Sequence, residues 1–302
     1  MTDKLITKIN NLKEEKDAVI LAHNYQEAEI QELADYTGDS LGLSRKAANL
    51  ESEVILFCGV KFMAQSAAIL SPQKTVLLPE KNAECPMAKM ISRAELKDLK
   101  DKHPKAAVVC YVNSSAEVKA ESDVCCTSSN AVEIVKKVAS EKVIFVPDRN
   151  LGAYVAQKTD KEIICEQGYC PTHARPKAKD IEQVRKIHPQ AKIVVHPECE
   201  AEVISKADFV GSTAEIIDFA KHSRAEKIIV GTEAGILHQL EKDNPDKTFY
   251  ILNQALICRN MKLVRLENIV AALENMEYQI NVEEKIRKQA QIALNKMLEL
   301  SN

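Results

Sequence analysis

The sequence contains no tryptophan, and aromatic residues make up only 4% of its 302 positions. Few flat side chains are therefore available to stack against nucleic-acid bases. An excess of one charge is also missing, because 41 basic residues nearly balance 44 acidic ones and the formal net charge is −3. So small a charge gives no reason to expect nucleic acid or an anionic membrane as a partner.

Long apolar runs are absent as well. No uninterrupted run approaches the roughly 20 residues that cross a bilayer as a helix. Residues 1–17 are polar and charged, and their apolar positions Leu5, Ile9 and Leu12 predict a short surface helix and no signal peptide. We therefore expect a cytoplasmic protein without a membrane partner, whose nine cysteines lie in a reducing compartment where disulfides are rare.

Two local signatures of cofactor sites are missing. The chain has no C-x-x-C pair, and it has neither G-x-G-x-x-G nor a P-loop, so a nucleotide site is not expected. A metal site built from thiols would need ligands from distant segments. Cys58, Cys110, Cys125 and Cys126 are expected to be packing residues, because they lie in apolar runs or next to each other.

One pattern of apolar runs and polar residues occurs three times along the chain. The first run of each copy reaches a landmark: His23 in AVILAHNYQ, Tyr111 in AVVCYVNSS and His196 in KIVVHPECE. After the landmark, every copy has a polar residue at +2, an aspartate at +12, a hydroxyl residue at +17 and a cysteine at +59 or +62. These residues are, in order, Tyr25, Asn113 and Glu198; Asp35, Asp123 and Asp208; Ser40, Ser128 and Thr213; and Cys85, Cys170 and Cys258. Four markers in register indicate an internal repeat.

Each copy continues with a second and a third apolar run, which predicts the order strand, helix, strand, helix, strand. Short continuous runs rich in Val and Ile are typical of parallel strands covered on both faces. The predicted fold class is α/β, with three homologous three-layer αβα units, short parallel sheets and pseudo-threefold symmetry around a central cavity. The predicted units are residues 1–86, 87–172 and 173–261, followed by C-terminal helices in 262–302 that pack on the repeats.

The repeat predicts one shared site. Ligands of open parallel sheets bind beyond the carboxyl ends of the strands, where the landmarks and the three cysteines would lie. Cys85, Cys170 and Cys258 would then meet in one cavity and hold either zinc with one open position or a 4Fe–4S cluster with one free iron. Pro86 and Pro171 suit helix starts, where the preceding thiols would lose their protons more readily. The alternative is three buried thiols without a metal.

The polar residues around these thiols indicate an anionic substrate. Backbone N–H groups at helix starts bind carboxylate or phosphate, and four hydroxyl residues are predicted there: Ser40, Ser128, Ser212 and Thr213. Helix capping alone is an alternative interpretation. Three histidines are candidate acids, bases or anion partners: His23, His173 and His196. Glu198 is a candidate general base if the cavity raises its pKa.

Motifs along nearly the whole chain, from about residue 18 onward, resemble those of the quinolinate synthase family: ILAHNYQ, GDS, CPMA, YVNS, CTSSNAV, PDRNLG, CPTH, VHPEC, DFVGST, GTEAG and CRNMK. The resemblance implies three similar α/β domains around a central 4Fe–4S cluster held by Cys85, Cys170 and Cys258. It implies condensation of iminoaspartate (iminosuccinate) with dihydroxyacetone phosphate to quinolinate, phosphate and water, a step of NAD biosynthesis. The free iron would act as a Lewis acid.

The resemblance also implies a substrate site. Its matching residues are His23, Tyr25, Ser40, Tyr111, Asn113, Ser128, His173, His196, Glu198 and Thr213. Proton transfer is expected of four of them: Tyr25, Tyr111, His196 and Glu198. A functional contact with the aspartate oxidase or dehydrogenase that produces iminoaspartate is a further expectation. Some family members carry C-x-x-C-x-x-C at the third ligand, whereas this chain has CRNMKLV, which leaves Cys258 as the one choice.

Two other hypotheses stay open at this stage. The diphthamide-forming radical enzymes resemble this chain in drawing one cysteine from each of three related domains. They would need a site for S-adenosylmethionine, and they would act on a protein. A non-enzymatic Fe–S redox sensor is the other hypothesis. The dense set of polar residues beside the thiols favours a small anionic substrate over both.

Overall fold

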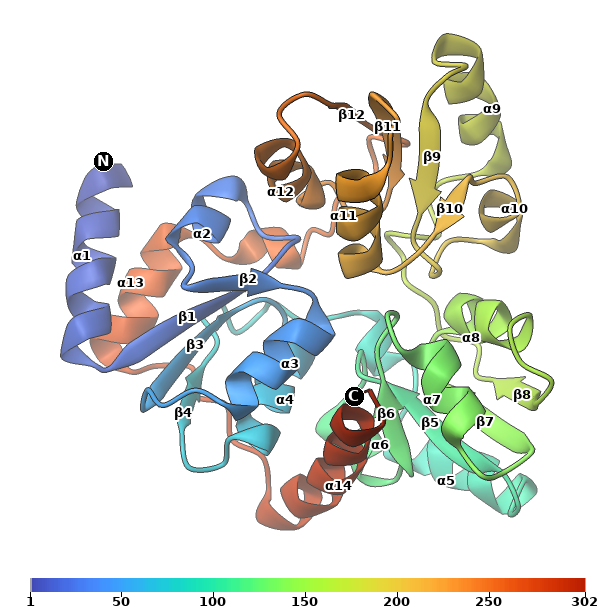
Figure 1. Ribbon diagram of the computed structural model, residues 1–302. Coiled ribbons are helices and arrows are strands. Elements are labelled where there is room, and N and C mark those ends of the chain that lie inside the picture. Colours follow the sequence, from blue (N-terminus) through green and yellow to red (C-terminus); the bar gives the residue numbers. More distant parts are fainter. Residues whose placement is uncertain (1, 302) are drawn as a thin grey trace.

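The apolar runs that repeat in the sequence form three separate parallel sheets. The structure is a computed structural model that describes residues 2–301. Each sheet contains four parallel strands. Figure 1 shows the three units in the order of the sequence, the first in blue, the second in green and the third in yellow and orange. The predicted α/β class with three αβα units is confirmed.

The sheet of the first unit is covered by helices on both faces. Its strand order is β2-β1-β3-β4. In the central strand β1, Ile20 packs with residues of α1 and of the C-terminal helix α13 (Leu266–Asn275), whereas Leu21 packs with residues of α3 and α4. Alternate residues thus enter two cores, so every position of the run is apolar. The elements are α1 (Thr2–Glu15), β1 (Ala18–His23), α2 (Ala28–Leu33), β2 (Tyr36–Gly38), α3 (Ser40–Ala48), β3 (Val54–Cys58), α4 (Lys61–Leu70) and β4 (Thr75–Leu77).

The second and third units repeat this strand order, as β6-β5-β7-β8 and β10-β9-β11-β12. The second contains η1 (Met87–Lys89), α5 (Arg93–Lys102), β5 (Ala107–Tyr111), α6 (Ala116–Ala120), β6 (Val124–Cys126), α7 (Ala131–Lys137), β7 (Lys142–Val146), α8 (Arg149–Ala156) and β8 (Glu162–Cys165). The third contains α9 (Ala178–Ile187), β9 (Lys192–Val195), α10 (Ala201–Ile204), β10 (Phe209–Val210), α11 (Thr213–His222), β11 (Lys227–Gly231), α12 (Ile236–Asp243) and β12 (Thr248–Ile251). The unit boundaries at residues 86, 172 and 261 stay a prediction.

Every unit contains one more strand than the sequence predicts. In each unit, a strand of two or three residues follows the helix that comes after the first strand. This short strand, β2, β6 or β10, pairs with the first strand at the sheet edge. The segment AEIQELADYTG, which lies between the first two apolar runs, divides into α2 and β2. So short a strand leaves no periodic pattern in the sequence, which is why the predicted order of three strands is wrong on this point.

The repeated aspartates at +12 fasten these edge strands to the sheet. In each unit the aspartate carboxylate accepts the backbone N–H of the residue three positions before the landmark, and the aspartate N–H donates to the carbonyl of that same residue. The carboxylate bonds are Ile20 N to Asp35 Oδ2 at 2.8 Å, Val108 N to Asp123 Oδ2 at 2.7 Å and Ile193 N to Asp208 Oδ2 at 2.9 Å. We call these three residues the edge aspartates.

The C-terminal helices pack on the first two units. Helix α13 (Leu266–Asn275) lies beside α1, and α14 (Glu284–Leu300) contacts α4, α6 and β6 (Figure 1). The buried stripe of α14 consists of Ala290, Ala293, Leu294 and Met297. With 17 residues, α14 is long, yet no helix in residues 2–301 is both long and apolar enough to cross a membrane.

Candidate active site and metal centre

The first strands of the three units lead into one cavity. Strand β1 ends at His23, β5 ends at Tyr111, and β9 ends one residue before His196, so each unit contributes its landmark. The structure brings together every residue of the set that the sequence analysis assigns to the site. The cavity is lined by His23, Tyr25, Ser40, Cys85, Tyr111, Asn113, Ser128, Cys170, His173, His196, Glu198, Thr213 and Cys258. Their chemical roles stay predictions at this point.

The three cysteines lie in the loops that follow the last strand of each unit, and each begins a tight turn. Cys85 precedes η1, and Cys258 precedes the second 3₁₀ helix, η2 (Met261–Leu263). Backbone N–H groups two and three residues further on donate to both sulfurs, and Cys170 receives one such bond from the N–H of His173. Bonds of this kind favour the thiolate, which is the form that binds a metal.

Burial nevertheless raises the pKa of all three thiols, that of Cys85 to about 12. The expectation that these thiols lose their protons more readily is therefore wrong for the protein alone, because desolvation outweighs the N–H bonds. A thiol of such high pKa is deprotonated when a metal cation coordinates it. The three cysteines are therefore better suited to bind a metal than to act as reactive thiolates without one.

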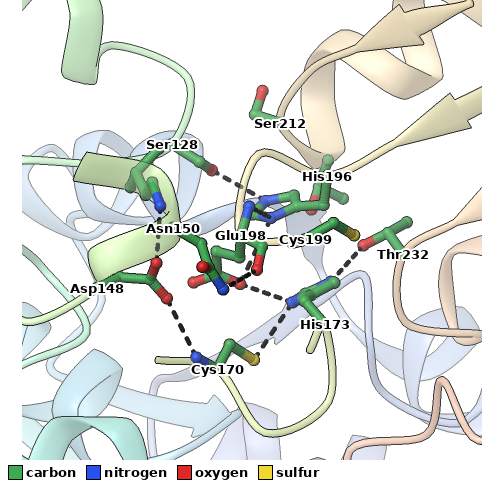
Figure 2. A network of polar contacts seen from close by, with 12 residues as sticks. Ser128, Asp148, Asn150, Cys170, His173, His196, Glu198, Cys199, Ser212 and Thr232 are labelled. Carbon is green, nitrogen blue, oxygen red and sulfur yellow. Dashed lines mark hydrogen bonds and ion pairs between the residues drawn. The ribbon is translucent and has the colours of Figure 1, made fainter. Parts of the chain in front are cut away.

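Glu198 lies at the centre of a buried polar network, which Figure 2 shows. His173 Nδ1 lies 2.6 Å from Glu198 Oε2 and 3.3 Å from Cys170 Sγ. The ring of His196 stacks on that of His173, with 4.5 Å between the centroids. Donor atoms of Cys170, His173 and Glu198 all lie within 4.8 Å of one another, so these three side chains could hold a metal ion.

His23 and His196 occupy the same local turn in the first and third units. In both, ring Nδ1 accepts the backbone N–H two residues further on, from Tyr25 at 3.1 Å and from Glu198 at 3.3 Å. Burial lowers the pKa of each ring to about 3, so both are neutral near pH 7 and carry their proton on Nε2. His196 donates this proton to Ser128 Oγ at 3.2 Å. Each ring therefore carries its N–H on Nε2, and in His196 this N–H is bonded to Ser128.

Glu198 keeps its negative charge inside the protein. Burial alone would raise the pKa of this carboxyl, but the attraction between the carboxylate and the protonated forms of His196 and His173, with a hydrogen bond from His173, holds it below its ordinary value. The rise in pKa on which the general-base prediction depended does not occur. Glu198 Oε1 and Asn113 Oδ1 are buried without a hydrogen-bond partner among the described residues. Buried oxygens of this kind require a donor, so both are available to a ligand.

The two tyrosines of the site keep their protons, because burial raises the pKa of Tyr25 and of Tyr111 well above its ordinary value. Tyr25 Oη lies 2.8 Å from Thr213 Oγ1 and 2.7 Å from Thr232 Oγ1. Thr232 Oγ1 in turn lies 2.8 Å from His173 Nε2. The sequence analysis does not single out Thr232. It follows β11, and the equivalent residues of the other copies, Gly59 and Pro147, have no hydroxyl.

Ser40 and Thr213 are the first residues of α3 and α11, but neither caps its helix. The caps are the preceding residues, Asp39 and Ser212, whose side chains accept backbone N–H groups of the first turn. The Ser40 and Thr213 side chains line the cavity instead. Ser128 lies three residues before the start of α7, so its predicted position at a helix start is wrong. Ser212 is a helix cap and is not among the residues that line the cavity.

Comparisons with known proteins agree with this arrangement. The family model for quinolinate synthetase A protein matches residues 7–299. The chain belongs to the quinolinate synthase family. The quinolinate synthase of Alkaliphilus metalliredigens is 55% identical over 297 residues, which are 98% of each chain. Those of Dehalococcoides mccartyi and Clostridium kluyveri are 54% identical over 300 and 297 residues, 99% and 98% of each chain. The family resemblance of the motifs is confirmed, and the protein is an enzyme.

In this member of the quinolinate synthase family, the cavity also has lining residues that the sequence analysis does not assign. They are Asp39, Val60, Phe62, Met63, Thr127, Thr172, Glu233 and Met261. Val60, Phe62 and Met63 lie at the start of α4 and give one side of the cavity an apolar wall. Glu233 is a fully buried carboxylate that follows β11. Its counterpart in the first copy is Val60, so the repeat does not reveal it as a polar position.

Proposed function

We propose that the protein is a quinolinate synthase that condenses iminoaspartate with dihydroxyacetone phosphate to quinolinate, phosphate and water in NAD biosynthesis. One observation carries the proposal: thiols from three separate units and a buried carboxylate, Glu198, line the same cavity. Small-molecule sites are typically concave and combine apolar lining with a few convergent polar groups, and this cavity has both. The reaction itself is suggested by near-full-length identity with proteins named quinolinate synthase.

The cysteines fit a 4Fe–4S cluster better than a single zinc ion. In a tetrahedral zinc site the sulfurs lie about 2.3 Å from the ion and hence about 3.8 Å from one another. Among residues 2–301, no set of three cysteine sulfurs lies within 4.8 Å of one another. Ligands of a cluster bind different irons and are therefore spread more widely. We propose Cys85, Cys170 and Cys258 as the ligands of such a cluster, whose free iron would supply Lewis-acid help to a leaving hydroxyl.

Neutral donors are proposed to bind the anionic groups of the substrates. None of the described residues that line the cavity is a lysine or an arginine. The neutral rings of His23 and His196 offer N–H groups, and the first turns of α3 and α11 offer the hydroxyls of Ser40 and Thr213. Helix N-termini favour carboxylate and phosphate. Asn113 and Ser128 would complete the set on the side of the second unit.

The proposed proton chemistry separates an acceptor from its donors. Glu198 is the proposed acceptor because of its position, since it is ionised and its Oε1 has no partner among the described residues, although its lowered pKa makes it a weak base in the ligand-free protein. Tyr25 and Tyr111 are donors, because their raised pKa values keep them protonated. Imine–enamine exchange and ring closure need both functions. The contact from Tyr25 through Thr232 to His173 gives a path by which the donor could recover its proton.

The direct test is an anaerobic assay of the iron-loaded protein with dihydroxyacetone phosphate and iminoaspartate, the latter produced in place by an aspartate oxidase. We expect quinolinate and phosphate in equal amounts. The same preparation is then given S-adenosylmethionine. If that compound is cleaved and no quinolinate forms, the diphthamide-type alternative replaces this proposal. If neither reaction occurs while the cluster is present, the redox-sensor alternative gains support. A contact with the enzyme that supplies iminoaspartate stays a proposal.

A further inference from the structure

One backbone hydrogen bond recurs in all three units beside the proposed cluster ligands. It joins the loop after the second central strand, β3, β7 or β11, to the loop that carries the cysteine. The donor is the third residue after the end of that strand, and the acceptor is the carbonyl two residues before the cysteine. The three bonds run from Lys61 N to Ala83 O, from Arg149 N to Gly168 O and from Ala234 N to Leu256 O, each at 2.8 Å. Each cysteine loop is thus tied at the same point.

In two of the units a buried carboxylate stands directly before this donor. Asp148 Oδ2 accepts the N–H of Cys170 at 3.1 Å, while Asp148 Oδ1 accepts the N–H of Leu151 at 2.7 Å. Figure 2 shows Asp148 facing the backbone nitrogen of Cys170. Glu233 Oε1 accepts the N–H of Cys258 at 3.0 Å, while Oε2 accepts a second backbone N–H, at 2.7 Å. Each carboxylate therefore connects two backbone segments, one of them at a cysteine.

The first unit shows that the fold does not need this carboxylate. Val60 occupies the equivalent position, and no described side chain accepts the N–H of Cys85. The loop of Cys85 nevertheless closes through the same backbone bond from Lys61 to Ala83. Asp148 and Glu233 are both fully buried, and burying a carboxylate is costly unless hydrogen bonds compensate. Two such carboxylates beside cysteines point to a task beyond chain closure.

We infer that Asp148 and Glu233 are positioning residues that fix Cys170 and Cys258 as cluster ligands by holding their backbone N–H groups. The inference rests on the proposed function, because it assigns the two residues a task toward the cluster. An amide cannot replace either carboxylate. Asn or Gln has one acceptor oxygen and an NH₂ group, so one of the two backbone N–H groups would face a donor.

The experiment compares Asp148→Asn and Glu233→Gln with wild type after anaerobic cluster loading. The measurement is the rate of iron release to an excess of a chelator, together with the electron paramagnetic resonance spectrum of the reduced cluster. Loss of a residue that orients a metal ligand typically weakens metal binding about 10–100-fold. We therefore expect iron release to be about tenfold faster in each variant. Asp123→Asn is the matched control, because it alters an edge aspartate of the second unit that touches no cysteine.

Four outcomes separate the possibilities. Faster iron release in both variants but not in Asp123→Asn supports the inference. Release at the wild-type rate overturns it, as does an equal acceleration in Asp123→Asn, which would mean a general loss of stability. A wild-type protein without iron and sulfide overturns the proposed function, and the inference with it.

A second measurement covers the case in which a variant takes up no cluster. In the metal-free protein, we expect amide hydrogen exchange at Cys170 to be faster in Asp148→Asn and exchange at Cys258 to be faster in Glu233→Gln. Unchanged exchange at both amides overturns the inference without any need for iron. Because the two variants lie in different units, failure of one to fold leaves the other as an independent test.

Discussion

The edge aspartates are identical in the three units, whereas the residues at the inner strand ends differ from unit to unit. Asp35, Asp123 and Asp208 each accept one backbone N–H in the same way. The inner positions carry histidine or tyrosine at the landmark, and tyrosine, asparagine or glutamate two residues later. The edge bond is the same in every sheet, so the same residue, aspartate, occurs there in each unit. The shared cavity needs a different chemical group from each unit, so the inner residues differ.

The first and third units make this difference clear, because their inner turns share one backbone arrangement. Both place a neutral histidine whose Nδ1 accepts the N–H of the +2 residue. That +2 residue is Tyr25 in the first unit and Glu198 in the third. Burial raises the pKa of Tyr25, whereas the imidazoles around Glu198 hold its pKa down against the effect of burial. In the proposed mechanism, the same turn would thus present a proton donor in one unit and a proton acceptor in the other.

The largest effect is expected from Glu198→Gln, which removes the acceptor and keeps the shape of the side chain. A positioned general base typically contributes about 10²–10⁴-fold to the rate, so quinolinate formation should fall by about that factor. Iron content and melting temperature should not fall, since glutamine keeps an oxygen that can accept from His173 and Glu198 is not a ligand of the proposed cluster. The measurements are kcat, iron per chain and thermal unfolding.

Glu200→Gln is the matched control for this prediction. Glu200 lies two residues further on, pairs with Arg149 at 3.7 Å and Lys177 at 3.8 Å, and is not among the residues that line the cavity. We expect its kcat to stay near that of wild type. Near wild-type turnover in Glu198→Gln would remove Glu198 from the mechanism.

The next largest effect concerns the inner hydroxyls, Ser40, Ser128 and Thr213. Replacing each with Ala should weaken binding of a dicarboxylate substrate analogue by about ten- to a hundredfold, because a hydrogen bond to a charged group contributes about 1.5–3 kcal/mol. Calorimetry gives the affinity, and thermal unfolding gives the stability.

Ser212→Ala provides the contrast, since Ser212 is the cap of α11 directly before Thr213. Loss of a cap costs about 0.5–2 kcal/mol of stability, so this variant should unfold more easily and bind the analogue as wild type does. If the hydroxyl variants lose stability while all three keep their affinity, the anion-binding proposal fails for these residues.

The smallest effect is expected from the edge aspartates, and it should be a loss of stability without a loss of turnover. Changing Asp35, Asp123 or Asp208 to Ala leaves a backbone N–H without its acceptor, which costs about 1–3 kcal/mol of the free energy of unfolding. The kcat of the folded, iron-loaded fraction should not change. Urea unfolding and turnover per bound cluster measure the two quantities. A selective fall in kcat would contradict the separation between edge and inner residues.

The sequence predicts the central strands and the shared cavity because the apolar runs are continuous and the polar residues keep their spacing. Strands β2, β6 and β10 are not predicted, because two or three residues are too few to show a periodic pattern of apolar residues. The sequence also places Cys85, Cys170 and Cys258 near each other, because their distances from the landmarks nearly coincide. Such a register identifies positions that recur in every unit.

Features present in only one or two units are harder to predict. Thr232 has no hydroxyl counterpart, and Asp148 and Glu233 are replaced by Val60 in the first copy. The pKa of Glu198 is lowered by His196, two residues away in the sequence, and by His173, which is distant in the sequence and lies 2.6 Å away in the fold. Burial also reverses the expected shift in the pKa of the thiols. These features depend on contacts between segments, which spacing along one chain does not encode.

The central claim is that each unit contributes one thiol to a common cluster, and iron and sulfide analysis after anaerobic preparation tests it most directly. We predict iron and acid-labile sulfide in the ratio of a 4Fe–4S cluster for the wild type and for Cys58→Ala and Cys126→Ala, whose thiols are fully buried outside the cavity. Cys85→Ala, Cys170→Ala and Cys258→Ala should each lose the cluster. Stoichiometric zinc without iron in the wild type, or a full cluster in any of these last three variants, would contradict the claim.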